Sequence, residues 1–137
     1  MRKEIPEDLM TFFRSEKRVS AAYLFGSRAK KIQTPESDID IAVLLSETPK
    51  KLLEYYLYLV SKLSRILGNE VDLVILNDSP PLLKHQVIKY GKVLYFRREE
   101  ARIAFEARVQ SEYLDFSRAI ARYDECFIKQ TLAQKEP

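Results

Sequence analysis

Two apolar segments separated by a Gly-Ser turn decide the fold of this chain: YLFGSRAKKIQTPESDIDIAVLL, residues 23–45. In the second segment Asp38 and Asp40 alternate with isoleucines, and a period of two is typical of a strand. The two carboxylates would then project from one face, roughly 6.6–6.8 Å apart along the strand. Unpaired carboxylates are costly away from water, so we expect something at this face to compensate their charge.

Outward from this stretch, segments with helical and extended patterns alternate along the chain. The expected helices cover residues 6–14, 27–33, 48–68, 82–90 and 99–134, and the expected strands cover residues 19–25, 38–45, 70–76 and 92–96. Thr48 is the expected N-cap of the third helix with Pro49 at its first position, and Gly68 is its expected end. This order predicts an α/β (α+β) fold with a small sheet, flanking helices and a long C-terminal helix. The change of pattern near Arg97 predicts a domain over residues 1–97 and a C-terminal helix over residues 98–137.

Composition narrows the class of protein. A chain of 137 residues with one cysteine, Cys126, predicts one domain without an intramolecular disulfide. The net charge of +3 is too small to indicate nucleic-acid binding by itself. The N-terminal residues lack the apolar region of a secretory signal, and no apolar run reaches the length of a membrane span. We therefore expect a cytoplasmic protein that binds neither a membrane nor nucleic acid directly.

A third carboxylate follows in the sequence VDLV, residues 71–74, where Asp72 lies within an apolar strand. If this strand neighbours the one that holds Asp38 and Asp40, the three carboxylates form a triad whose mutual repulsion a metal would relieve. Mg²⁺ prefers oxygen ligands, and carboxylates with this spacing can converge on two ions about 3.5–4 Å apart. The alternative is that each aspartate is a solvent-facing residue at a strand end.

The turn after the first strand carries groups that suit phosphate. Gly26 lets the backbone approach a ligand closely, and Ser27 adds a hydroxyl at the start of a possible helical turn. Arg28, Lys30 and Lys31 add positive charge at the same place. Alone, this turn reads as an N-cap serine in a tight loop, but together with the aspartates it predicts a phosphate-transfer site.

Gly26-Ser27, ten residues and then Asp38-Ile39-Asp40 resemble the signature of the DNA polymerase β-like nucleotidyltransferases. The resemblance covers roughly residues 19–96 and is strongest to the minimal nucleotidyltransferases (MNT), the small partners of HEPN proteins in prokaryotic toxin–antitoxin pairs. It implies a nucleotidyltransferase fold, built on a mixed sheet, that binds Mg²⁺ and ATP. By this resemblance Gly26 and Ser27 hold the β- and γ-phosphates, with Arg28 and Lys31 beside them. Many relatives have glycine where this chain has Lys31.

The same resemblance implies the roles of the aspartates and the reaction. Asp38 and Asp40 would ligate two Mg²⁺ ions, and Asp72 would complete the first metal site and help to deprotonate the acceptor. The acceptor in MNT antitoxins is a tyrosine of the HEPN toxin, which receives AMP from ATP. Two alternatives stay open: transfer to a small molecule, and an antitoxin that acts by stoichiometric binding without catalysis.

The long C-terminal helix carries an apolar seam with spacings of three and four residues. The seam comprises Phe105, Val109, Tyr113, Phe116, Ile120, Tyr123 and Phe127. About 35 residues at 1.5 Å each span roughly 50 Å, against about 30 Å for the diameter of a small domain. We therefore expect another chain to cover part of the seam, either a helical HEPN-type partner or a second copy of this chain.

Overall fold

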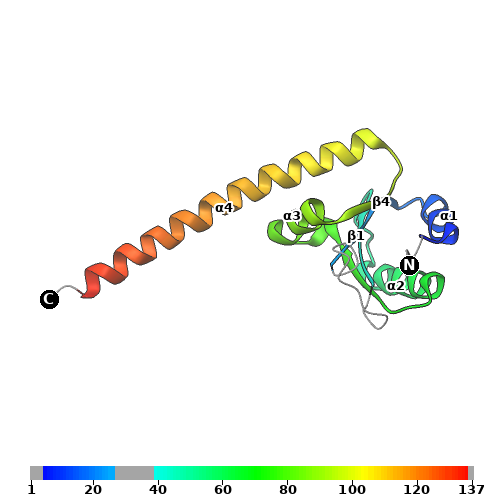
Figure 1. Ribbon diagram of the computed structural model, residues 1–137, viewed down its shortest axis with the longest axis horizontal. Coiled ribbons are helices and arrows are strands. Elements are labelled where there is room, and N and C mark those ends of the chain that lie inside the picture. Colours follow the sequence, from blue (N-terminus) through cyan, green and yellow to red (C-terminus); the bar gives the residue numbers. More distant parts are fainter. Residues whose placement is uncertain (1–4, 27–38, 136–137) are drawn as a thin grey trace.

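A four-stranded mixed sheet with helices on both faces forms the body of the protein (Figure 1). The computed structural model describes residues 5–26 and 39–135. The elements are α1 (Glu7–Ser15), β1 (Val19–Phe25), β2 (Ile39–Leu45), α2 (Leu52–Leu67), β3 (Val71–Ile75), the 3-10 turn η1 (Leu76–Asp78), α3 (Pro81–Tyr90), β4 (Lys92–Phe96) and α4 (Glu99–Lys135). The α/β (α+β) class and the long C-terminal helix are therefore confirmed.

The strands lie in the order β3-β2-β1-β4. β1 pairs antiparallel with both β2 and β4, and β2 pairs parallel with β3. A parallel pair needs a crossover connection, which α2 supplies between β2 and β3. The sequence VDLV thus lies directly beside the strand that holds Asp40, which meets the condition on which the predicted carboxylate cluster depended.

Each face of the sheet has its own hydrophobic cluster. On one face α1 and α2 cover the sheet, through buried residues that include Phe13, Leu59 and Leu63. On the other face Val87 of α3 and Phe105 and Val109 of α4 pack with buried residues of β1 and β2. Successive residues of a strand therefore contribute to different clusters, as the alternation in the sequence predicts.

An asparagine closes the far end of the β2–β3 pair. Beyond β3, in η1, the Asn77 side chain accepts a hydrogen bond from the Leu45 backbone N–H at 2.8 Å and donates one to the Leu45 carbonyl at 2.9 Å. The Asn77 amide thereby makes the two hydrogen bonds that a further residue of β3 would make, so the N–H and carbonyl groups of Leu45 both have a partner.

The start of α2 corrects one expectation. Thr48 and Pro49 precede the helix, which begins at Leu52 with Lys51 at the N-cap position and no side-chain hydrogen bond to the cap. The end at Gly68 is confirmed, since this residue adopts the left-handed conformation at φ +65°. The helical turn expected over residues 27–33 lies outside the described residues.

Only the first part of α4 packs on the domain. Phe105 and Val109 are buried, and the Lys84 ammonium of α3 pairs with the Glu112 carboxylate at 2.8 Å. One residue later the rings of His85 and Tyr113 stack with centroids 3.6 Å apart. Beyond this point α4 continues away from the sheet (Figure 1). None of the helices in the described ranges is long and apolar enough to cross a membrane.

Candidate active site

Two of the three predicted carboxylates lie side by side on neighbouring strands. Asp40 of β2 is the register partner of Asp72 in the parallel ladder with β3. Neighbouring strands are about 4.8 Å apart, and register partners project from the same face of a sheet. Asp40 is half-buried and Asp72 is exposed. The fold therefore builds a carboxylate pair that solvent can reach, with the oxygen ligands that Mg²⁺ prefers.

Gly26 contacts one member of this pair. Phe25 is the register partner of Asp40, and the chain leaves β1 at Gly26 with φ +76°. A Cβ atom added to Gly26 would overlap the Asp40 carboxylate and lie 2.8 Å from its Cγ. Because Gly26 has no side chain, the Asp40 carboxylate can occupy the space next to it. The sequence did not reveal this role of Gly26.

The carboxylate pair lies on the face of the sheet that α3 and α4 cover. Residues two apart in a strand share a face, so Asp40 lies with Ala42, and Asp72 lies with Val74. Ala42 is fully buried in the cluster that contains Val87, and Val74 packs against that cluster. The pair therefore lies at the end of a buried apolar face, next to the turn at Gly26.

A partly buried hydrogen bond fixes α4 on this same face. The Tyr23 hydroxyl of β1 donates to the Glu106 carboxylate at 3.1 Å, and Arg102 donates to the same oxygen at 2.7 Å. Burial, and then the Glu106 carboxylate, raise the pKa of Tyr23 above its ordinary value of 10.0. The sequence reveals the Arg102–Glu106 pair by its i, i+4 spacing but not its tyrosine partner, which lies 83 residues away.

The remaining predicted site residues are Ser27, Arg28, Lys31 and Asp38, and they lie outside the described residues. Within the described ranges no group of three or more histidine, cysteine, aspartate and glutamate side chains could hold a metal ion. The carboxylates of Asp40 and Asp72 are hard oxygen donors that fit Mg²⁺, which commonly uses one or two protein carboxylates together with substrate phosphates. The structure thus brings together Gly26, Asp40 and Asp72 from the predicted set.

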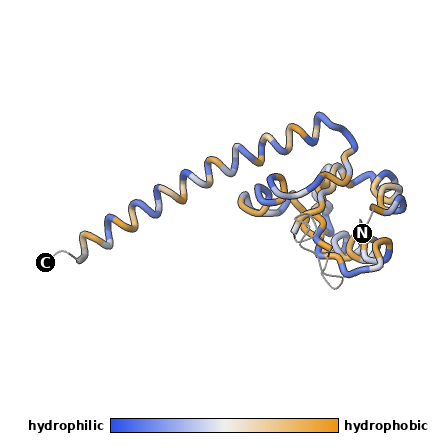
Figure 2. The backbone as a smooth tube through the Cα atoms, viewed as in Figure 1, coloured by the Kyte–Doolittle hydropathy of each residue, from blue (hydrophilic) through white to orange (hydrophobic). Residues whose placement is uncertain are grey.

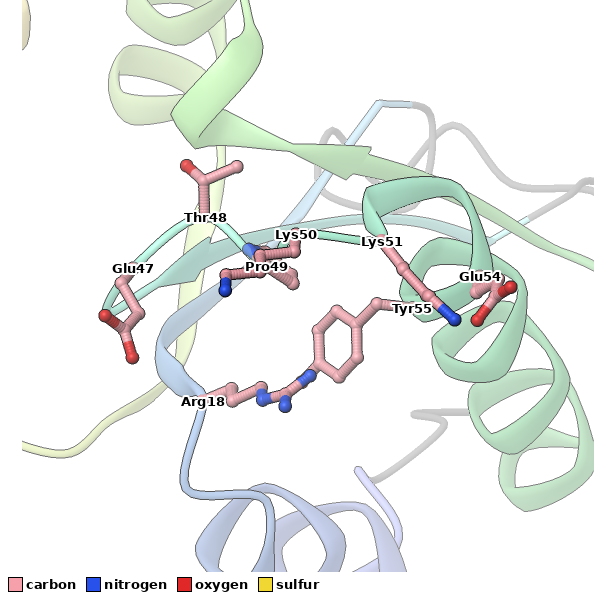
Figure 3. A pocket seen from close by; sticks show the side chains of 8 residues that line it. All are labelled: Arg18, Glu47, Thr48, Pro49, Lys50, Lys51, Glu54 and Tyr55. Atoms are coloured by element: carbon pink, nitrogen blue, oxygen red, sulfur yellow. The ribbon is translucent and has the colours of Figure 1, made fainter.

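A cavity of about 670 Å³ lies at the opposite end of the sheet (Figure 3). The cavity is lined by Arg18, residues 47–51, Glu54 and Tyr55. Within it the Arg18 guanidinium lies 5.1 Å from the centre of the Tyr55 ring. Val19 pairs with Leu45 at this end, whereas Phe25 pairs with Asp40 at the other. Six residues of strand separate the two ends by about 20 Å, so this cavity is distinct from the carboxylate pair.

Comparisons with known proteins agree with this geometry. The family described as Polymerase beta, Nucleotidyltransferase matches residues 7–100. The chain is 38% identical over 78 residues to protein adenylyltransferase MntA of Shewanella oneidensis. That alignment covers 57% of this chain and 55% of MntA, so it spans about half the length of this relative.

Solved structures extend the likeness to most of the chain. A structure of a toxin–antitoxin with AMP-PNP matches with a TM-score of 0.72 and 28% identity, over 90% of this chain and 99% of the matched chain. A structure of a tri-AMPylated Shewanella oneidensis HEPN toxin in complex with its MNT antitoxin matches with a TM-score of 0.66 and 28% identity, over 88% and 94% of the two chains. The family match over more than half of the chain and the carboxylate pair lead to one conclusion: this chain belongs to the polymerase β nucleotidyltransferase family, with a fold similar to that seen in structures that contain an MNT antitoxin.

Proposed function

We propose that this protein transfers AMP from ATP to a hydroxyl group of a HEPN-type helical toxin, most simply a tyrosine, and acts as its antitoxin. The observation that carries the proposal is the in-register pair of Asp40 and Asp72 beside Gly26. The name of MntA as a protein adenylyltransferase and the AMP-PNP and tri-AMPylated toxin structures of similar chains support the choice of ATP and of the partner.

The proposed roles follow from the chemistry of the side chains. Asp38, Asp40 and Asp72 would hold two Mg²⁺ ions, while Gly26, Ser27, Arg28 and Lys31 would hold the phosphates. Bound magnesium would neutralise negative charge on the triphosphate and on departing pyrophosphate.

Asp72 has a second role in the proposal. It is exposed on β3, so it can accept the proton of an incoming hydroxyl. The hydroxyl oxygen then bonds to the α-phosphorus, the bond from that phosphorus to the bridging oxygen breaks, and pyrophosphate leaves.

We assign transfer to residues 1–97 and partner binding to the helix in residues 98–137. Beyond Tyr113, α4 exposes apolar side chains, and Figure 2 shows that apolar and polar residues alternate along the helix. These exposed residues are Leu114, Phe116, Ile120, Tyr123, Phe127, Ile128 and Leu132. Four of them, Phe116, Ile120, Tyr123 and Phe127, follow spacings of three and four residues and therefore share one face of the helix. Aromatic and large aliphatic residues are typical of interface cores, and such a face suits a helical protein.

The toxin is the occupant that we propose for this helix face. The matched chains of toxin–antitoxin structures are covered almost to their full length, and 88–90% of this chain is aligned to them. A second copy of this chain is the competing occupant, and the size of the complex in solution distinguishes the two.

The test uses the purified protein, α-labelled ATP, Mg²⁺ and the HEPN-type protein encoded beside it. We expect label on the partner, with Asp40→Asn and Asp72→Asn each lowering the rate of transfer by about 100-fold or more. Asp78→Asn is the matched control, because this exposed aspartate follows the opposite end of β3 and should leave the rate unchanged.

The two alternatives give different results in the same assay. A stable complex that neutralises the toxin without label would establish stoichiometric binding instead of catalysis. Label on small hydroxyl compounds, with none on the partner, would assign a small-molecule transferase. Transfer at the parent rate in both Asp40→Asn and Asp72→Asn would contradict the site.

A further inference from the structure

The sheet-facing side of α3 ends in a residue to which the proposed reaction assigns no role, Tyr90. Leu83, Val87 and Tyr90 have the spacing i, i+4 and i+7, which places them on one side of a helix. Val87 is fully buried and Leu83 packs against the same cluster, whereas Tyr90 is 46% exposed. The apolar side of α3 therefore extends past the buried cluster to an accessible aromatic ring.

The direction of α3 brings this ring to the carboxylate end of the sheet. α3 begins beyond the far end of β3 and returns to Gly91, whose backbone lies against β1. A Cβ added to Gly91 would lie 3.0 Å from the Leu24 carbonyl oxygen and 3.4 Å from the Phe25 Cβ. Tyr90 directly precedes Gly91, and Phe25 directly precedes Gly26. Tyr90 therefore lies one residue from the contact between Gly91 and Phe25, where the proposed phosphate turn begins.

The spacing along helix and strand also matches. Val87 shares a buried cluster with Ala42, and Asp40 lies two residues from Ala42 on the same face. Two strand residues span roughly 6.6–6.8 Å, and one helical turn spans about 5.4 Å. One turn beyond Val87, Tyr90 is therefore approximately level with Asp40, on the same face of the sheet.

The chemistry of this corner suits a nucleotide. The Lys89 ammonium lies 5.2 Å from the centre of the Tyr90 ring, which adds positive charge beside an aromatic surface. Aromatic rings stack on nucleobases, and cations attract phosphates. We infer that Tyr90 is a nucleotide-binding residue whose ring stacks on the purine base of ATP held at Gly26 and Asp40. This inference rests on the proposed function, since it assigns a further contact to the same ATP.

Binding of Mg²⁺–AMP-PNP and Mg²⁺–tripolyphosphate, measured by calorimetry, tests this contact. Tyr90→Ala should raise the Kd for AMP-PNP about fivefold or more and leave the Kd for tripolyphosphate unchanged, because only the first ligand has a base. Tyr90→Phe should retain the parent affinity, since the ring is kept. Tyr58→Ala, at a tyrosine of α2 that is 42% exposed, is the matched control and should change neither Kd.

A fluorescence experiment reports the stack directly. The chain contains no tryptophan, so Tyr90→Trp introduces a single reporter. AMP-PNP should quench it and tripolyphosphate should not, while neither ligand should affect a Tyr58→Trp reporter on α2.

Three results would overturn the inference. An unchanged AMP-PNP affinity in Tyr90→Ala, in a protein whose parent form binds AMP-PNP, would remove Tyr90 from the site and leave the proposed function intact. Equal losses for both ligands would show that Tyr90 acts on phosphate or on folding rather than on the base. A parent protein that does not bind AMP-PNP would contradict the inference and the proposed function together.

Discussion

At the scale of single residues, Gly26 and Asp40 occupy a space that holds only one side chain. The Asp40 carboxylate lies where a Cβ of residue 26 would be, and φ at residue 26 is +76°. Two requirements therefore coincide at Gly26: a left-handed backbone and the absence of a side chain. The strain and the collision can be separated experimentally, because Gly68 has a similar φ of +65° with nothing within 4 Å of an added Cβ.

Gly26→Ala should reduce AMP transfer by up to about 100-fold, because the displaced Asp40 carboxylate can no longer hold its position. Gly68→Ala should cost about 1 kcal/mol of unfolding free energy through the same backbone strain and leave transfer unchanged. Rates with labelled ATP and denaturant unfolding of both variants give the comparison. Equal losses of transfer in the two variants would mean that strain alone, and not contact with Asp40, explains the effect.

The raised pKa of Tyr23 predicts how the unfolding free energy changes with pH in the alkaline range. Its pKa is raised in the folded protein by burial and by Glu106, so the folded state disfavours the tyrosinate. The stabilisation by the neutral hydroxyl is complete below pH 10 and is lost as the pH rises above 10, by at most about 1.4 kcal/mol per pH unit for one group.

Tyr23→Phe removes both the hydrogen bond and the titration. The variant should be less stable than the parent by about 1 kcal/mol at pH 9, and the difference should shrink as the pH rises to 11. Urea unfolding at a series of pH values measures it, with exposed Tyr123→Phe as the control that should follow the parent. A difference that stays constant from pH 9 to 11 would contradict the linkage between Tyr23 titration and folding.

At the scale of elements, the strands were predictable because local patterns determine them. β1 spans the predicted residues 19–25 and β4 the predicted residues 92–96. The start of α2 was not predictable from Thr48 and Pro49, because the helix begins where Leu52 first packs against the core. Packing thus overrides a local capping signal. Residues 49–51, which were expected in the helix, belong to the connection before it.

The site was predictable only as a set of candidates. The sequence identified Asp40 and Asp72 as carboxylates in strands, but their pairing depends on β3 lying parallel to β2 and in register with it. A shift of one residue would turn Asp72 to the opposite face, and the sequence of either strand alone does not fix that register. Tyr90 could not be assigned from sequence, since its position depends on the return of α3 to the end of β1.

At the scale of the whole molecule, α4 divides into a part that packs on the domain and a part that is exposed. Its proximal part is fixed by Phe105, Val109 and the Tyr23–Glu106 hydrogen bond. Its 37 residues span about 55 Å, and the apolar residues beyond Tyr113 are exposed. The seam that the sequence shows as continuous is therefore covered by the domain over its first part only.

Removal of residues 118–137 should leave the unfolding free energy of the domain within about 0.5 kcal/mol of the parent, because residues 118–133 are almost all exposed. The truncated protein should still bind AMP-PNP and should lose the complex with the HEPN-type toxin. Denaturant unfolding, calorimetry and size-exclusion chromatography with light scattering measure the three properties.

Val109→Ala and Ile120→Ala are the point controls for this division of α4. Val109 is 1% exposed, so Val109→Ala should lower the unfolding free energy by about 2 kcal/mol. Ile120 is 46% exposed, so Ile120→Ala should change the unfolding free energy little. A truncated protein that still forms the toxin complex would contradict the proposed role of the distal helix. A dimer of the full-length protein that truncation abolishes would assign the helix to self-association.

The order of the strands has a consequence for access. β3 is an outer strand of the described sheet, and Asp72 lies near its beginning with its side chain exposed. A macromolecule can therefore approach Asp72 edge-on, and the sheet itself need not rearrange to admit it. In the proposed reaction the bound acceptor would itself cover the exposed side of Asp72, so the exclusion of water from the site would depend on which acceptor binds.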